Sequence, residues 1–162
     1  LGQLEASLVW SHLLERTKTA NPTAPEVDLS GRYTDTTAED GGGYPGDKAN
    51  FRFQWMLNDL SISYLAEYIS SLDADTFCNC FDGNTPAMDG TYIQKIDSYL
   101  YHDLVASYTF ESFGSTTQIS GGVTNITDEE PPFIEVGFNA TTDPAIYRMF
   151  GRGWYLRLKW SY

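Results

Sequence analysis

The stretch FGRGWYLRLKWSY, residues 150–162, decides the fold, because its side chains separate by position into two chemically different sets. Side chains of a β-strand point alternately to opposite faces, so every second residue shares a face. A strand with an apolar face that bears tryptophans, and with cations behind it, is typical of an outer-membrane β-barrel whose outer face meets lipid. The apolar set is Trp154, Leu156, Leu158, Trp160 and Tyr162, and the other set is Tyr155, Arg157, Lys159 and Ser161.

Composition and charge argue against a nucleic-acid-binding protein and against a helical membrane protein. The chain has 162 residues, of which 41% are hydrophobic, and 22 acidic residues outnumber 10 basic ones to give a formal net charge of −12. Such a surface repels phosphates, so we expect no nucleic-acid partner. No run approaches the roughly 18 apolar residues of a membrane helix, whereas barrel strands need a hydrophobic residue only at every second position.

The same alternation predicts five further strands upstream of the tail. A cation on the lipid face at mid-membrane costs about 2–4 kcal/mol, so the parity of charged residues tests the barrel prediction. Arg52, Glu67, Asp103, Arg157 and Lys159 all fall on the polar parity, while His102 falls on the apolar one, where we expect an interfacial position. The apolar faces of the five strands run from Leu4 to Leu14, Phe51 to Leu57, Leu60 to Tyr68, Leu100 to Phe110 and Ile119 to Val123.

The connections between these strands alternate between short and long. Asn58-Asp59 and residues 111–115 are short turns, while long polar segments cover about 17–47, 73–96 and 127–149. Outer-membrane barrels have short periplasmic turns and longer extracellular loops, so we expect the long segments outside the cell and the C-terminus in the periplasm. About six strands cannot close a barrel, which needs roughly eight. Residues 1–162 are therefore predicted to be an all-β, antiparallel, transmembrane segment of a larger β-barrel, because open edges are not tolerated in lipid.

Several stretches resemble the last strands and loops of TonB-dependent outer-membrane receptors. The apolar set of the tail is similar to the C-terminal signal by which the outer-membrane assembly machinery recognises barrels. The chain departs from the family pattern at Ile126-Thr127, where Leu-Phe is common, and at Tyr162, where Phe is usual. The stretches are IDSYLYHDL (96–104), ASYTF (106–110), GVTNITDEEPP (122–132), GFNA (137–140), TDP (142–144) and GR (151–152).

This resemblance, which is specific from about Asp97 to Tyr162, implies the last six strands of a 22-stranded barrel. It implies energised uptake of a scarce nutrient: an iron chelate such as a siderophore, a vitamin or an oligosaccharide. The implied partners are the upstream strands and plug domain, TonB through the N-terminal part, outer-membrane lipid and the nutrient ligand. The plug domain and TonB box are absent from this sequence. We therefore expect a chain that opens at Leu1 to be a receptor's tail, a processed piece or one subunit of a split receptor.

Candidate ligand-binding residues lie in the long segments. The aromatic side chains of Phe133, Phe138 and Tyr147 could stack on a sugar or a chelate, or pack the loops against one another, which is the interpretation we favour. A second set, Asp73, Asp75 and Asp82, offers the hard oxygen ligands that calcium prefers. Their spacing does not match an EF-hand, so we expect a solvated acidic loop and no bound metal.

The two cysteines, Cys78 and Cys80, are separated by one residue. A disulfide between them would close a small, strained ring, although an oxidising surface permits one, and a zinc site would need further ligands. We expect a loop feature. The sequence has no nucleophile elbow, phosphate-binding loop or spaced histidine cluster, so we expect neither an enzyme nor a cofactor.

The alternative hypothesis is a secreted β-sandwich that acts as a carbohydrate-binding module. Such a domain would account for the strands, the loop aromatics and the lack of a catalytic motif. It would not account for the apolar face of residues 154–162 or for the alternation of short and long connections.

Overall fold

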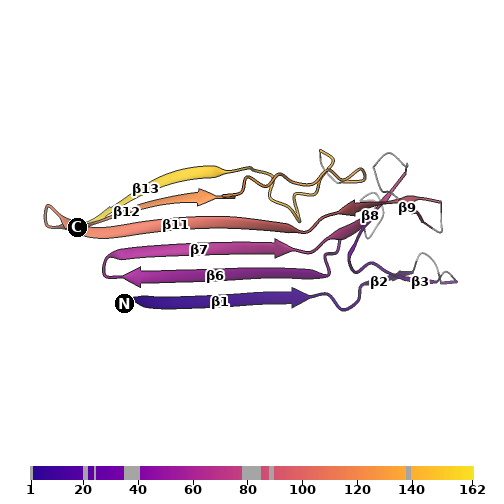
Figure 1. Cartoon of the computed structure of the whole chain (residues 1–162), viewed down its shortest axis with the longest axis horizontal. Helices are drawn as coiled ribbons and strands as arrows, with labels where there is room; N and C mark the ends of the chain where they lie inside the picture. The colour runs from indigo at the N-terminus through magenta and orange to yellow at the C-terminus, as the bar shows by residue number, and fades with distance from the viewer. Residues whose placement is uncertain are drawn as a thin grey trace.

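Six long strands lie side by side in one sheet, and shorter strands gather at one end of it (Figure 1). The structure is a computed structural model that describes residues 2–19, 22–23, 25–34, 41–77, 85–87, 90–137 and 140–162. These residues contain thirteen strands and no helix, and therefore no helix long and apolar enough to cross a membrane. The prediction of an all-β chain is confirmed.

The six long strands are the six that the alternation predicts. They pair antiparallel in the order β1-β6-β7-β11-β12-β13, which leaves β1 and β13 as the two edges. Within the described part of the chain the edges do not pair with each other, so the sheet is open and no barrel closes. The strands are β1 (Gln3–His12), β6 (Asp47–Leu57), β7 (Leu60–Ile69), β11 (Tyr99–Ser112), β12 (Ser115–Thr124) and β13 (Gly153–Ser161).

Two tight turns close one end of this sheet. Asn58 and Asp59 join β6 to β7, and Asn58 has a φ of 51°, in the left-handed region that asparagine tolerates. Phe113 and Gly114 join β11 to β12 with φ values of 53° and 75°, the positive pair that a two-residue type I′ hairpin needs. The second turn is shorter than predicted, because β11 continues to Ser112. Both chain termini lie at this end (Figure 1), and we use the name strand end for the whole sheet of six long strands.

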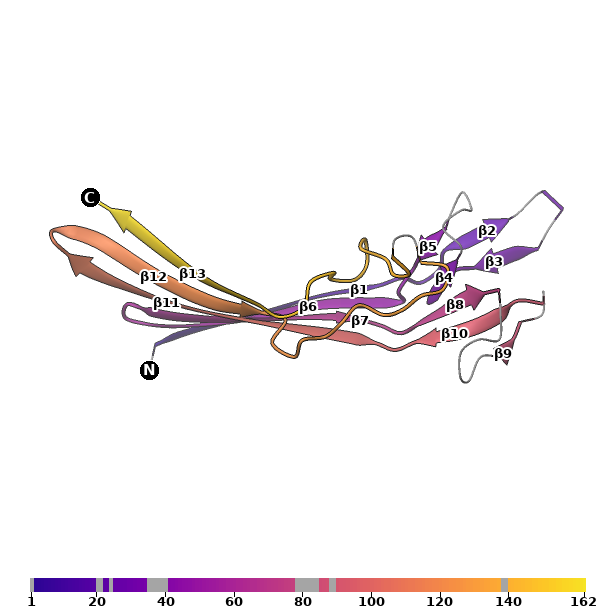
Figure 2. The ribbon, with the colours of Figure 1, turned by 90° about the horizontal axis from the view of Figure 1, so that it is seen from above.

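Seven short strands occupy the opposite end, within segments that the sequence predicts as loops. One group forms a five-stranded sheet in the order β5-β4-β8-β10-β9, antiparallel except for β4 and β8, and β2 pairs with β3. Since β8 follows β7 and β10 leads into β11, this sheet continues outward from the long strands (Figure 2). The strands are β2 (Thr17–Thr19), β3 (Glu26–Asp28), β4 (Arg32–Thr34), β5 (Gly42–Gly43), β8 (Leu72–Thr76), β9 (Thr85–Pro86) and β10 (Tyr92–Ile96).

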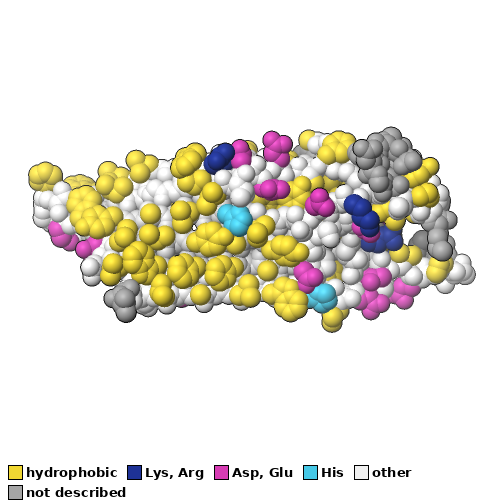
Figure 3. Space-filling view, viewed as in Figure 1, with side chains coloured by type: hydrophobic (Ala, Val, Ile, Leu, Met, Phe, Trp, Pro, Cys, Tyr) yellow, Lys and Arg dark blue, Asp and Glu magenta, His cyan; other side chains and the backbone are white. Residues whose placement is uncertain are grey.

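The register of the long strands places the apolar parities on one common face, and we call this the apolar face. Its side chains are strongly exposed on the edge strands, with Leu8 at 67%, Trp154 at 75% and Leu156 at 79%, and partly exposed on the strands between. Figure 3 views this part of the molecule and shows hydrophobic side chains spread over the long strands. One row of paired residues crosses all six strands: Leu4, Trp55, Ile62, Ala106, Gly121 and Leu156.

The buried core lies at the other end, which we call the loop end. It combines the ends of β7 and β11 with the five-stranded sheet and with the β12–β13 loop, residues 125–152. In Figure 2 this loop lies alongside the long strands and reaches the short strands. The core residues are Tyr33, Ile69, Leu72, Ala74, Ile96, Tyr101, Ile134, Val136 and Tyr147.

Candidate functional site

The β12–β13 loop sends one arginine onto the polar face of the long sheet. Arg148 donates a hydrogen bond from Nε to Glu67 Oε2 at 2.9 Å, and its Nη2 lies 2.8 Å from the same oxygen. Its Nη1 donates to both oxygens of Asp103, at 2.8 and 3.0 Å. The guanidinium carbon lies 5.1 Å from the ring centroid of Tyr101. Arg148 is thereby held by two carboxylates and one aromatic ring.

The pairing of β7 with β11 creates this arrangement. Glu67 lies opposite Tyr101, and Asp103 lies two residues further along β11 on the same face. The three charged side chains are partly buried, with Asp103 exposed by only 15%. Partial burial opposes the charged form of Arg148, but hydrogen bonds to Asp103 and Glu67 raise its pKa above the usual value. The arginine therefore stays charged.

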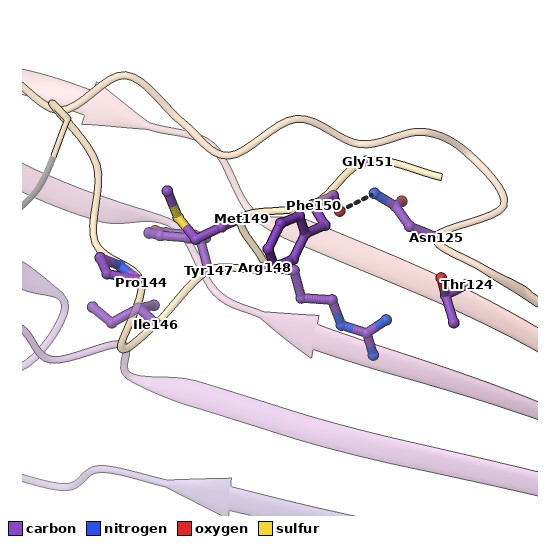
Figure 4. A pocket seen from close by; sticks show the side chains of 9 residues that line it. All are labelled: Thr124, Asn125, Pro144, Ile146, Tyr147, Arg148, Met149, Phe150 and Gly151. Carbon is purple, nitrogen blue, oxygen red and sulfur yellow. Dashed lines mark hydrogen bonds between the residues drawn. The ribbon is translucent and has the colours of Figure 1, made fainter. Parts of the chain in front are cut away.

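Asp103 also fixes the first residue of the same loop. The backbone N–H of Asn125 donates to Asp103 Oδ1 at 2.9 Å. The Asn125 side chain, only 1% exposed, donates to the carbonyls of Glu129 at 2.8 Å and Phe150 at 3.4 Å, and it accepts from the Glu129 N–H at 2.9 Å (Figure 4). Asn125 thus ties the two ends of the loop together above β11.

A second contact closes the base of the loop beside β13. The backbone N–H of Arg152 donates to Asp128 Oδ1 at 2.6 Å, and the two side chains form an ion pair at 3.3 Å. The hydrogen bond from the Arg152 backbone lowers the pKa of Asp128, and the arginine charge acts in the same direction. The path of the chain from β12 to β13 is therefore fixed at several points.

Of the three predicted loop aromatics, Tyr147 is a packing residue. It is 3% exposed, and its ring meets that of Tyr99 edge-on at 5.0 Å. Its buried hydroxyl has no hydrogen-bond partner among the described residues, and burial raises its pKa. Phe133 is 54% exposed, and its carbonyl accepts a hydrogen bond from Gln94 at 2.7 Å. Phe138 lies outside the described residues.

Two cavities flank the contact between Arg148 and Asp103. The first, which we call the loop cavity, has a volume of about 500 Å³ and includes Arg148 in its lining (Figure 4). The second, the sheet cavity, has a volume of about 380 Å³ and includes Asp103. Thr124 lines both. The loop cavity is completed by Asn125, Pro144, Ile146, Tyr147, Met149, Phe150 and Gly151, and the sheet cavity by Arg52, Gln54, Ser63, Tyr64, Leu65, Val105 and Tyr155.

The predicted calcium candidates form ion pairs on β8. Asp73 lies 2.7 Å from Lys95, and Asp75 lies 2.6 Å from Arg32. Asp82, together with Cys78 and Cys80, falls outside the described residues. In the part of the chain that the structure describes, no three side chains of metal-ligating type come together.

The remaining singled-out residues lie on the apolar face. The five residues of the assembly-signal prediction project from β13 and its end, with exposures from 59% at Trp160 to 100% at Tyr162. His102 has the predicted apolar parity, since it pairs with Ala66. Its Nδ1 lies 2.6 Å from the Tyr64 hydroxyl, and the two rings stack at 5.9 Å.

No sequence pattern points to Arg148, although the alternation of the strands predicts the polar parity of both its partners. Glu67 and Asp103 precede it by 81 and 45 positions, so no local pattern links the three residues. Comparison with protein-family models, curated proteins and solved structures gives no match for this chain.

Proposed function

We propose that this chain is the C-terminal segment of a TonB-dependent outer-membrane receptor, where it forms barrel wall and extracellular loops for energised uptake of a scarce nutrient. The observation that carries the proposal is the apolar face, which crosses all six long strands and is most exposed on the edge strands β1 and β13. A broad apolar surface of this kind is stabilised by an apolar environment, and lipid around a barrel supplies one.

The distribution of charge on the other face supports the same proposal. Arg52, Glu67 and Asp103 belong to the polar face, and the sheet cavity opens there. A polar interior and an apolar exterior are the two faces of an outer-membrane strand. On this proposal the polar face lines the lumen, and the β12–β13 loop folds into it.

The two unpaired edges fit a segment of a larger barrel. Strands β1 and β13 each present one row of backbone N–H and C=O groups that no strand of the described chain pairs. Such groups are costly in lipid, so the proposal requires neighbouring strands on both sides. The upstream strands of the same receptor would supply them.

The β-sandwich alternative has less support. A sandwich buries the apolar face of one sheet against a second sheet about 10 Å away. No described element covers the apolar face here, where Leu4 is 64% and Leu158 is 68% exposed.

The first experiment measures where the native polypeptide resides and how large it is. Outer membranes are washed with alkaline carbonate and extracted with detergent, and the species that carries this sequence is identified by intact mass. We expect extraction only with detergent, at a mass far above 18.2 kDa. Recovery in the carbonate wash or the soluble fraction would contradict the proposal. A detergent-extracted species near 18.2 kDa would instead point to a subunit of a split barrel.

The second experiment tests the direction of the two faces with a matched pair of variants. Ala106 lies on the apolar face, and its neighbour Ser107 lies opposite serines on both flanking strands. Ala106→Arg should cost about 2–4 kcal/mol of folding free energy in bilayers, whereas Ser107→Arg places the same charge in the lumen at little cost. The readout is folding into lipid vesicles, followed by gel mobility with and without heating. Equal losses in both variants would argue against a lipid-facing surface.

Function is tested by energised uptake. Deletion of the gene should abolish accumulation of one nutrient from a panel of labelled iron chelates, corrinoids and oligosaccharides. The loss should match that caused by deleting TonB or collapsing the proton gradient. Uptake that persists without a proton gradient would indicate a passive channel instead.

A further inference from the structure

Glu67, Tyr101 and Asp103 together form what we call the cation seat. Two carboxylates on neighbouring strands hold one guanidinium through contacts of 2.8 to 3.0 Å, and an aromatic ring lies below it. Planar guanidinium groups bind carboxylates through paired hydrogen bonds and stack on aromatic rings, so this geometry is selective for such cations. Arg148 shows which chemical group the seat accepts.

The seat and its occupant belong to different kinds of structure. Glu67, Tyr101 and Asp103 project from two paired strands of the sheet, whereas Arg148 lies on a connecting segment without regular secondary structure. The backbone positions of the seat are therefore set by strand pairing and not by Arg148. Its departure would leave two carboxylates on adjacent strands without their cation, which strongly favours binding of another one.

The surroundings of the seat provide space for more than a small ion. Arg148 lines the loop cavity of about 500 Å³, Asp103 lines the sheet cavity of about 380 Å³, and Thr124 lines both. Beside Arg148 the loop cavity presents the apolar side chains of Ile146, Met149 and Phe150 (Figure 4). An occupant with a cationic head and an apolar body fits this combination.

From these observations we propose that the cation seat is a binding site for an organic cation, a guanidinium or amidinium carried on an apolar body. Arg148 occupies this site as an internal competitor. Binding of the ligand displaces Arg148 and releases this part of the β12–β13 loop from the polar face. The inference rests on the proposed function only in placing the seat within a pore that solutes enter.

A purely structural role for Arg148 makes different predictions. If Arg148 only anchors the loop, removing the arginine does not increase the affinity for an external guanidinium. Adding that guanidinium to the unaltered protein then also leaves the backbone of the loop unchanged. Binding affinity and loop exchange therefore separate the two roles.

The binding experiment uses the complete native polypeptide in detergent with 4-aminobenzamidine as the probe and 4-aminobenzoate as its anionic counterpart. Arg148→Gln should tighten amidine binding by about tenfold or more, because a competitor that fills the seat most of the time is gone. The double variant R148Q/E67Q should lose at least about tenfold of that affinity, and aminobenzoate should bind none of the proteins. The control is Arg152→Gln, which removes a loop arginine paired with Asp128 and should leave amidine affinity unchanged.

Amidine affinity that is equal in the unaltered protein and in Arg148→Gln would overturn the proposal. So would equal affinity in Arg148→Gln and R148Q/E67Q, since the seat would then take no part. A second measurement needs no variant. In the unaltered protein, saturating 4-aminobenzamidine should speed amide hydrogen exchange around residues 146–150, and unchanged or slower exchange there would also overturn the proposal.

These measurements are made in detergent without membrane, TonB or a proton gradient. Failure of energised uptake with intact amidine binding would overturn the proposed function alone. Uptake that survives while amidine binding fails would overturn the cation seat alone.

Discussion

Apolar side chains are buried at the loop end of this chain and exposed at the strand end. At the loop end, Tyr33, Leu72 and Ile134 are at most 1% exposed in a small core that strands and loop share. At the strand end, the large apolar residues Leu8, Trp154 and Leu156 are 67–79% exposed, in a single layer of strands. One chain thus holds a core that its own segments cover and an apolar surface that no described element covers.

The comparison shows that an apolar residue type does not by itself indicate burial within the protein, because the surroundings of the residue decide it. The loop end resembles an ordinary soluble domain, in which packing and the hydrophobic effect act together. The strand end gains its stability from backbone pairing and, on the proposed function, from lipid. The cation seat lies near the boundary, because Tyr101 belongs to the core while Asp103 lines a cavity of the sheet.

The largest expected difference concerns leucine truncation at the two ends. Leu72→Ala leaves a cavity in the closed core and should cost about 2–5 kcal/mol. Leu156→Ala loses contact with detergent or lipid chains but leaves no lasting cavity, so it should cost about 2 kcal/mol, from about 0.8 kcal/mol per carbon. Guanidinium unfolding of both variants in the same detergent measures the difference. A greater loss for Leu156→Ala would reverse the assignment of the two environments.

A smaller effect distinguishes the two faces within the strand end. A Cβ at Gly122 would lie 2.5 Å from the ring of Tyr155, while one at Gly121 meets nothing closer than 3.7 Å. Gly122→Ala should therefore destabilise the β12–β13 pair by about 1–3 kcal/mol, and Gly121→Ala should be close to neutral.

The ring of Tyr155 provides the control for the glycine comparison. In the background of Tyr155→Ala, Gly122→Ala should lose most of its cost, because the clashing ring is gone. Hydrogen exchange of β13 amides gives the readout for all four proteins. If Gly122→Ala still destabilises the pair without the ring, the glycine is required for the backbone conformation and not for the space that Tyr155 occupies.

The smallest expected effect is acid sensitivity confined to the loop end. The N–H of Arg152 lowers the pKa of Asp128 below its ordinary 3.8. A lowered carboxyl pKa contributes stability that is complete above the unfolded value and is lost as pH falls through the folded one. The base of the β12–β13 loop should therefore loosen only below about pH 4. Amide exchange of Arg152 across that range tests this, and Asp128→Asn should abolish the dependence.

Sequence alone predicts the strand end well, for a physical reason. Each long strand has one apolar and one polar side, so a period of two persists over about ten residues and sets both the strand and its orientation. The paired turns add glycine and asparagine where positive φ values occur. The register then confirms the common apolar face without exception among the residues that form the row from Leu4 to Leu156.

The loop end is harder to predict because its order depends on distant segments. Strand β8 does alternate, with Leu72, Ala74 and Thr76 buried between Asp73 and Asp75, but the same five residues also fit an acidic loop. Strand β4 has only three residues, and its partners β5 and β8 lie elsewhere in the chain. The contacts of Arg148 are equally non-local, so the candidate site is visible only once the strands are paired.

The position of Arg148 in the chain has a consequence for the order of assembly. Its partners in β7 and β11 come earlier in the sequence, and Gly153, the first residue of β13, follows a few residues after it. Once β7 and β11 have paired, capture of Arg148 tethers the chain close to where β13 must begin. The long connection from β12 is then replaced by a short one, which lowers the entropy cost of the final pairing. An arginine held on the two earlier strands thus shortens the free chain before β13 to the few residues between Arg148 and Gly153.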